Sequence, residues 1–181
     1  MRTGRSLVPG NRIGMEGRVH QGKPECSDMS ARVAMITGAN RGIGAAIAHA
    51  LAERGFDLAL GVRHPNDLPE DLVKLDPLIV SYQAEDPLAA KEFVSATEAR
   101  FGRIDVLVNN AGVGGPLELM PETPQPDDEM EEVLEQLLSV NVKAPFRPTR
   151  PALPSLCQAG SGRVLVVAPL SWRPVMGLNP G

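Results

Sequence analysis

From Arg32 onward, short apolar runs alternate with longer segments whose apolar residues recur every three or four positions. The runs have the length of buried strands, and the longer segments have the period of helices that pack along one side. Strands are predicted at 33–37, 58–62, 78–82, 104–108 and 164–167. Such alternation is typical of a parallel sheet covered by helices, so we predict an α/β protein with a doubly wound, Rossmann-type sheet of about five strands.

Capping residues mark where several helices begin and end. Asp86 is a good N-cap and Pro87 occupies the first helical position, while Gly102 stands where that helix should end. Gly55 has the same terminal position after the first helix. A third apolar stripe, from Met130 to Leu138, predicts a further helix.

Segment 144–156 departs from this pattern. It lies where the crossover helix between the last two strands should be, but it contains Pro145, Pro148, Pro151 and Pro154. A proline inside a helix lacks the N–H that the helix uses, and it costs about 3 kcal/mol. We therefore predict that this segment is not a regular helix.

Residues 1–28 differ in composition from the rest of the chain. They are rich in Gly and Arg and show no period of either kind, so we predict a disordered leader before a single domain that spans 29–181. The arginines suggest a transit peptide, but Glu16, Glu25 and Asp28 would spoil an amphipathic targeting helix. Met29 directly precedes the first strand, so translation could also begin there.

Composition narrows the range of partners. A net charge of −4 and a pI near 5.4 give no electrostatic footprint for nucleic acid or an anionic membrane surface. No apolar run approaches the roughly 20 residues that span a bilayer. The two cysteines, Cys26 and Cys157, are too few and too far apart for a disulfide framework or a zinc site. These features predict a cytoplasmic protein without a metal site that binds neither nucleic acid nor membrane.

The main functional motif is Thr-Gly-Ala-Asn-Arg-Gly-Ile-Gly, residues 37–44, directly after the first strand. Its glycines let the backbone turn sharply and approach a pyrophosphate, and the helix that follows offers free N–H groups and the positive end of its dipole. Glycine-rich turns between a strand and a helix are typical of dinucleotide sites. We therefore predict that the phosphates of a dinucleotide bind at this turn.

The Gly-x-x-x-Gly-x-Gly spacing of this motif resembles the short-chain dehydrogenase/reductase family. Phe-Gly-Arg-Ile-Asp-Val-Leu-Val-Asn-Asn-Ala-Gly, residues 101–112, resembles the family's fourth strand and its Asn-Asn-Ala-Gly motif, and 162–167 resembles the fifth strand. The resemblance implies strand order 3-2-1-4-5, a nicotinamide cofactor, and a bracing role for Asn109 in the sheet. It implies cofactor binding by Gly38, Asn40, Arg41, Gly42, Ile43, Gly44, Arg63, Asn110, Ala111 and Gly112.

Charge at the end of the second strand favours NADP over NAD. An NAD-selective site usually places a carboxylate there for the ribose hydroxyls, whereas a 2′-phosphate calls for Arg or Lys. Here Val62 stands where the acid would be, and Arg63 follows it. In the family pattern, Arg41 adds a second cation near the same phosphate, and Gln83 stands in place of the usual Asp near adenine.

The resemblance also implies hydride transfer between the cofactor and a small carbonyl or alcohol substrate, but the family's catalytic residues are incomplete here. The family uses a Ser and a Tyr followed four residues later by a Lys. Pro169 occupies the Ser position, Ser171 is the remaining candidate hydroxyl, and the Tyr would fall near Gly181. Asn141 matches the family Asn that kinks a helix and holds a proton-relay water. The chain thus looks like a family member cut off before its Tyr, its Lys and the last strands of the sheet.

Three hypotheses stay open on these grounds. The chain is an NADP-dependent oxidoreductase by descent, inactive without its catalytic end; or it is a non-catalytic NADP-binding module; or it is a truncated, unstable gene product. Whether it is an enzyme as it stands is left open, and a homo-oligomer is compatible with the sequence. The one tyrosine, Tyr82, is assigned to the third strand, far from the site.

Overall fold

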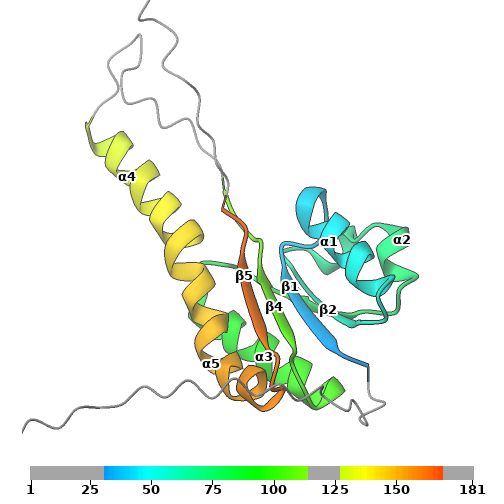
Figure 1. The fold of residues 1–181 in the computed structure, drawn as a ribbon. Helices are drawn as coiled ribbons and strands as arrows, with labels where there is room; N and C mark the ends of the chain where they lie inside the picture. Colours follow the sequence, from blue (N-terminus) through cyan, green and yellow to red (C-terminus); the bar gives the residue numbers. More distant parts are fainter. Residues whose placement is uncertain (1–30, 114–126, 169–181) are drawn as a thin grey trace, which may run out of the picture. The chain divides into compact units, whose positions relative to one another are not determined.

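The computed structural model describes residues 31–113 and 127–168. Within these ranges five parallel strands form one sheet: β1 (Val33–Thr37), β2 (Asp57–Val62), β3 (Leu78–Ser81), β4 (Val106–Asn109) and β5 (Arg163–Val166). Their order, β3-β2-β1-β4-β5, confirms the predicted Rossmann-type sheet (Figure 1). The predicted boundaries need only small shifts, the largest at β4, which begins two residues later than expected.

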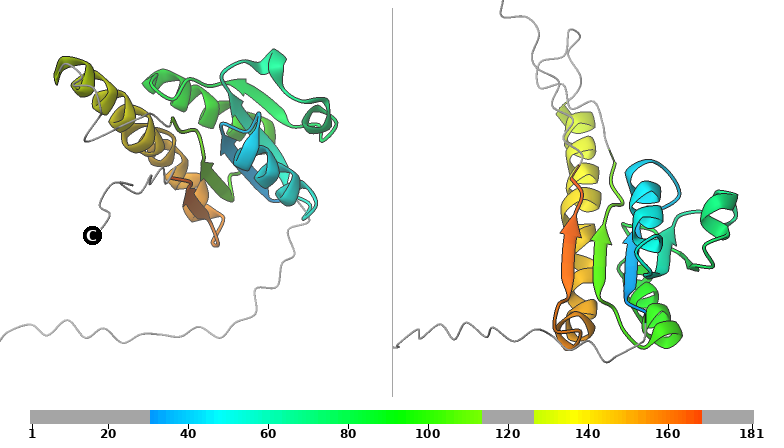
Figure 2. Two further views of the ribbon diagram at one scale, coloured as in Figure 1. Left: turned by 90° about the horizontal axis from the view of Figure 1, so that it is seen from above. Right: turned by 45° about the vertical axis from the view of Figure 1, so that its right-hand side comes forward.

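Helices cover both faces of this sheet. The described residues form five α-helices: α1 (Gly42–Ala52), α2 (Glu70–Val73), α3 (Pro87–Phe101), α4 (Asp127–Leu138) and α5 (Ala144–Gln158). Two short turns complete the path, the 3-10 turn η1 (Pro65–Asp67) and the π-helical turn η2 (Ser139–Lys143). The helices α1 and α2 lie on one side of the sheet, and α3 and α5 lie on the other (Figures 1 and 2).

Each face of the sheet has its own apolar core. On one side, Ala48 of α1 is fully buried in a cluster with Ile36 of β1. On the other side, Phe93 of α3 and Leu156 of α5 pack in a cluster with Met35. Successive strand residues point to opposite faces of the sheet. Neighbouring residues of β1 are therefore buried in different cores, one on each face. Coverage on both sides explains why the strands are continuous apolar runs rather than alternating ones.

The capping residues act as the sequence predicted. Asp86 precedes α3, and its Oδ1 accepts a hydrogen bond of 2.8 Å from the backbone N–H of Leu88. Gly102 follows α3 with a φ of 74°, and Gly55 adopts the same φ after α1. Since this left-handed conformation favours glycine, both residues end their helices at low cost.

The prediction that 144–156 is not a regular helix is wrong, because α5 spans Ala144–Gln158. Pro145 lies in the first turn, where a missing N–H costs little. Pro148, Pro151 and Pro154 lie inside the helix. The structural reason is burial: one face of α5, which includes Pro148, Ala152 and Leu156, is enclosed against the sheet and α3. Tertiary packing of this kind overrides local propensity.

At the edge of the described sheet, β5 is exposed along its whole length. Val164, Leu165 and Val166 are each between 43% and 57% exposed, so this strand presents an apolar edge. No helix among the described residues is long and apolar enough to cross a membrane. The described residues also contain no group of three or more side chains that could hold a metal ion. All of them belong to one compact unit that begins at Ala31, and the predicted leader lies outside them.

Candidate functional site

The carboxyl ends of β1, β2 and β4 border a cleft of about 700 Å³. The chain order of the strands reverses at β1, and open α/β sheets usually bind ligands at such a point. Most residues predicted to bind the cofactor line this cleft: Gly38, Asn40, Arg41, Gly42, Ile43, Arg63, Asn110, Ala111 and Gly112. A volume of this size lies within the range of small-molecule sites, ~300–1,000 Å³.

The loop between β1 and α1 adopts a backbone that favours glycine. Gly38 has a φ of 68° and Gly42 a φ of 58°. At Gly38 the absence of a side chain also makes room, because a Cβ there would lie 2.9 Å from the Cα of Ala111. The loop can therefore pass close to the turn after β4, and its own backbone forms part of the cleft surface.

Gly44 serves a different purpose from the other two glycines. It is buried, and it is absent from the cleft surface. A Cβ on Gly44 would lie 2.4 Å from both the carbonyl oxygen of Gly38 and the Nδ2 of Asn110. Its lack of a side chain thus allows α1 to begin directly behind the loop.

Thr37 and Asn110 hold the loop to the neighbouring strand end. The Thr37 hydroxyl accepts hydrogen bonds of 3.0 Å from the backbone N–H groups of Asn110 and Ala111. In return, the Nδ2 of Asn110 donates to the carbonyl oxygens of Thr37 at 3.1 Å and Gly38 at 2.9 Å. These bonds fix the two strand ends relative to each other.

The first turn of α1 faces the cleft without a side-chain cap. Arg41 is the N-cap residue and makes no capping hydrogen bond, and the turn contains no acidic residue. Gly42 and Ile43, the first two helical residues, line the cleft. Free N–H groups and the positive end of a helix dipole make such a terminus suitable for an anion.

Basic side chains flank the same region. Arg41, Arg63 and His64 all line the cleft, and all three are exposed. None of the three forms a salt bridge with another residue in the described ranges. Val62, where an NAD-selective site would carry its acid, is instead buried in the core. The end of β2 therefore presents cations to the cleft and no carboxylate at that position.

Of the two predicted catalytic residues, Asn141 lies near the cleft but not on its surface. It belongs to the π-helical turn η2, which lies between α4 and α5. Its Oδ1 accepts from the N–H of Val113 at 3.1 Å, and its Nδ2 donates to the carbonyl of Val113 at 2.9 Å. Asn141 thereby anchors the segment that follows the Asn-Asn-Ala-Gly motif. Ser171, like Pro169, lies outside the described residues.

Asn109 is fixed between β4 and α5, in agreement with a bracing role. It is buried, and its Nδ2 donates a hydrogen bond of 3.1 Å to the hydroxyl of Thr149. That hydroxyl in turn donates to the carbonyl of Pro145 at 2.7 Å, so the link reaches the start of the proline-rich helix.

Sequence reasoning missed several residues that line the cleft, of which Tyr82 is the most informative. The interpretation that Tyr82 lies far from the site is wrong: it follows β3 directly and lines the cleft together with Gly61, Ala84 and Val140. Burial raises the pKa of Tyr82 to about 12, with Arg147 lowering it and Glu85 raising it to smaller extents. The pattern of apolar residues gave no sign of this position, because a tyrosine suits both a strand and a pocket.

Comparison with known proteins identifies the family. Residues 32–172 match the family model of the short chain dehydrogenases. Agropine synthesis reductase from Rhizobium rhizogenes is 37% identical over 150 residues, which cover 82% of this chain and 33% of that protein. A chloroplastic NADPH-dependent aldehyde reductase-like protein from Arabidopsis thaliana is 31% identical over 169 residues, covering 84% of this chain and 60% of that protein.

Solved structures agree with these matches. A metagenomic short-chain oxidoreductase in complex with NADP has a TM-score of 0.64 at 34% identity, over 81% of this chain and 65% of that one. An alcohol dehydrogenase from the archaeon Thermococcus sibiricus, complexed with 5-hydroxy-NADP, has a TM-score of 0.62 at 34% identity, over 75% of this chain and 57% of that one. In each of these four comparisons the chain spans less than two thirds of the relative's length. The matched motifs, the strand order and the arrangement of the cleft lead to one assignment: the chain belongs to the short chain dehydrogenase family.

Proposed function

We propose that the chain binds NADP(H) in the cleft and is the nucleotide-binding part of an NADP-dependent oxidoreductase. The observation that carries this proposal is the uncapped start of α1, which faces the cleft with Arg41 and Arg63 beside it. NADP(H) carries two anionic groups, the pyrophosphate and the 2′-phosphate. The cleft offers backbone N–H groups for the pyrophosphate and guanidinium groups for the 2′-phosphate.

The pyrophosphate of the cofactor fits the glycine loop and the first turn of α1. Gly38, Gly42 and Ile43 leave the backbone accessible there, and the helix dipole favours negative charge at this end. The loop is already held in place by Thr37 and Asn110. Little ordering of the protein would therefore be needed when the nucleotide binds.

The 2′-phosphate fits the basic side of the cleft. Arg63 follows β2 directly, where the ribose is expected in a fold of this kind. A guanidinium group donates two parallel hydrogen bonds to a phosphate, and Arg63 has no carboxylate partner among the described residues. Two similar solved structures hold NADP or 5-hydroxy-NADP, which supports the same preference here.

When bound, the nicotinamide would supply a hydride to a small carbonyl substrate or accept one from a small alcohol substrate. Asn141 would hold the segment around Val113, which lines the cleft, through its two hydrogen bonds. We propose that residues 1–181 alone bind the cofactor without turnover, because their one tyrosine, Tyr82, packs in the core with a pKa raised by burial to about 12. A general acid needs a pKa near the working pH, which this group lacks.

A direct titration of NADPH fluorescence tests the proposal. We expect the wild-type chain to bind NADPH more tightly than NADH. Arg63→Ala should weaken NADPH binding about 10–100-fold, the value of a hydrogen bond to a charged group, and leave NADH binding unchanged. Arg150→Ala is the matched control, because Arg150 is exposed on α5 and does not line the cleft.

Two results would contradict the proposal. If the wild type binds neither nucleotide, the cleft is not a dinucleotide site. If Arg63→Ala weakens NADH and NADPH equally, Arg63 does not read the 2′-phosphate. The absence of turnover is checked separately, by following absorbance at 340 nm with NADPH and simple aldehydes or ketones.

Location and assembly belong to the same proposal. Two distant cysteines, of which Cys157 is free and exposed, suit a reducing compartment, and we place the protein in the cytoplasm. A homo-oligomer is compatible with the exposed apolar surface on β5.

A further inference from the structure

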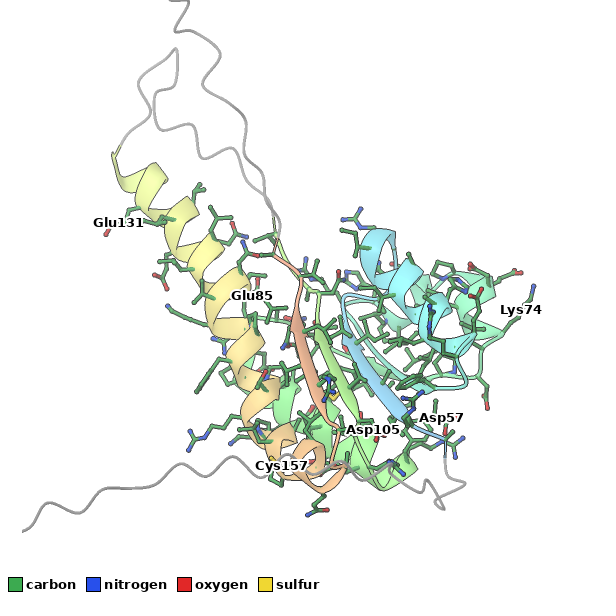
Figure 3. The ribbon with its side chains drawn as sticks, viewed as in Figure 1. Asp57, Lys74, Glu85, Asp105, Glu131 and Cys157 are labelled. Carbon is green, nitrogen blue, oxygen red and sulfur yellow. The ribbon has the colours of Figure 1, made fainter. Side chains whose placement is uncertain are left out.

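A second cavity, of about 240 Å³, opens at the amino ends of the strands. Its lining residues precede or begin four strands, or lie in the turn before β5: Arg32, Phe56, Asp105, Val106, Ser161 and Arg163. Figure 3 shows Asp57 and Asp105 at this end of the sheet and Glu85 at the other. The cofactor cleft borders the carboxyl ends of the strands, so the second cavity is separate from the proposed NADP(H) site.

Strand register places Arg32 and Arg163 on the same face of the sheet. Val106 of β4 pairs with Arg163 on one side and with Ala34 on the other. Paired residues point to one face, and Arg32 precedes Ala34 by two residues, so both arginines share the face of Val106. The pairing continues to Arg32, whose carbonyl accepts from the N–H of Asp57 at 2.8 Å. The two arginines therefore flank β4, on strands that lie ~10 Å apart.

Contacts with the wall of the cavity hold both guanidinium groups. The guanidinium carbon of Arg32 lies 4.2 Å from the centre of the Phe56 ring, which is a cation–π arrangement. Nη1 of Arg163 donates to the carbonyl oxygens of Ser161 at 2.8 Å and Gly162 at 3.1 Å. Because Phe56 and Ser161 both line the cavity, both charged groups lie beside it.

Both arginines are available to a ligand. Neither has a carboxylate partner among the described residues. The side chain of Arg32 forms no hydrogen bond with them, and that of Arg163 uses Nη1 alone. Asp105 also lines the cavity, but it is 2% exposed and accepts hydrogen bonds of 2.9 and 2.8 Å from Arg103. Its charge is compensated, so the cavity keeps an excess of positive charge.

The size and lining of the cavity favour a small dicarboxylate. Small-molecule sites usually enclose ~300–1,000 Å³, so 240 Å³ suits a ligand smaller than a nucleotide. A guanidinium fork donates two parallel hydrogen bonds to a carboxylate, and two forks on either side of β4 match two carboxylates. Phe56 and Val106 add apolar surface for a short methylene chain.

We propose that the second cavity binds a small aliphatic dicarboxylate, with one carboxylate on Arg32 and the other on Arg163. This site lies outside the cleft and does not require NADP(H) to be bound. Both arginines are exposed, so salt screens their charges and the affinity should fall as the ionic strength rises.

The test is isothermal titration calorimetry of the full chain with succinate, a four-carbon dicarboxylate, at low ionic strength. We expect succinate to bind about 10-fold more tightly than acetate, which can engage one guanidinium only. Arg32→Gln and Arg163→Gln should each weaken succinate binding about 10-fold, the value of a hydrogen bond to a charged group. Arg100→Gln is the matched control, because the Arg100 guanidinium also lies over a ring, that of Phe101 at 5.4 Å, but does not line the cavity.

The thermal midpoint of each variant without ligand reports whether its fold is intact. If a glutamine variant does not fold, Arg32→Lys or Arg163→Lys decides the question, because lysine keeps the charge, loses the fork and should still weaken succinate binding. Three results would overturn the inference: no binding of succinate, binding of inorganic phosphate as tight as that of succinate, or equal weakening in Arg100→Gln. The affinity for NADPH should be unchanged in all these variants, so failure of this inference and failure of the proposed function are distinguishable.

Discussion

At the scale of single residues, Gly44 shows how closely α1 and the loop are packed. In a helix, Gly→Ala alone should stabilise by about 1 kcal/mol. Here the new methyl group would lie 2.4 Å from the carbonyl oxygen of Gly38, a backbone atom that cannot simply rotate away. We predict that Gly44→Ala instead destabilises the protein by about 1–3 kcal/mol and weakens NADPH binding, as measured by urea unfolding and fluorescence titration.

Ala46→Gly, on the exposed side of α1, is the control and should cost about 1 kcal/mol and leave NADPH affinity unchanged. An unchanged or higher stability of Gly44→Ala would contradict the packing argument.

At the scale of elements, α5 carries more prolines than its helical conformation should tolerate. Pro154 is exposed, so replacing it removes little packing while returning an N–H to the helix. We predict that Pro154→Ala raises the free energy of unfolding by about 1–3 kcal/mol and increases the helical signal at 222 nm. Pro148→Ala is the matched comparison: Pro148 is buried, so lost packing should offset part of the same gain. If both variants gain equally, burial does not explain why the helix forms.

The helix α5 also shows which parts of the fold the sequence could predict and which it could not. The strands and the ends of α3 followed from local signals, since a buried run such as 33–37 and the Asp86–Pro87 cap act within a few residues. The glycine loop was found in the same way. The helical state of α5 and the place of Tyr82 depend on contacts with residues distant in the sequence, such as Phe93, and no local pattern encodes these.

At the scale of the whole molecule, β5 leaves an apolar edge open to other chains. Val164 is 43% exposed on a strand that pairs only with β4 within the described sheet. Unpaired strand edges with apolar side chains favour association between copies, and a lysine on such an edge opposes it.

We predict that the wild type shows a sedimentation coefficient that rises with concentration. Val164→Lys should remove this rise and lower the thermal midpoint by no more than a few degrees. Val73→Lys changes a similarly exposed valine, 48%, on α2 and should leave the association intact, because α2 offers no free strand edge. Loss of association in both variants would instead indicate a general effect of charge, and loss in neither would place the contact away from β5.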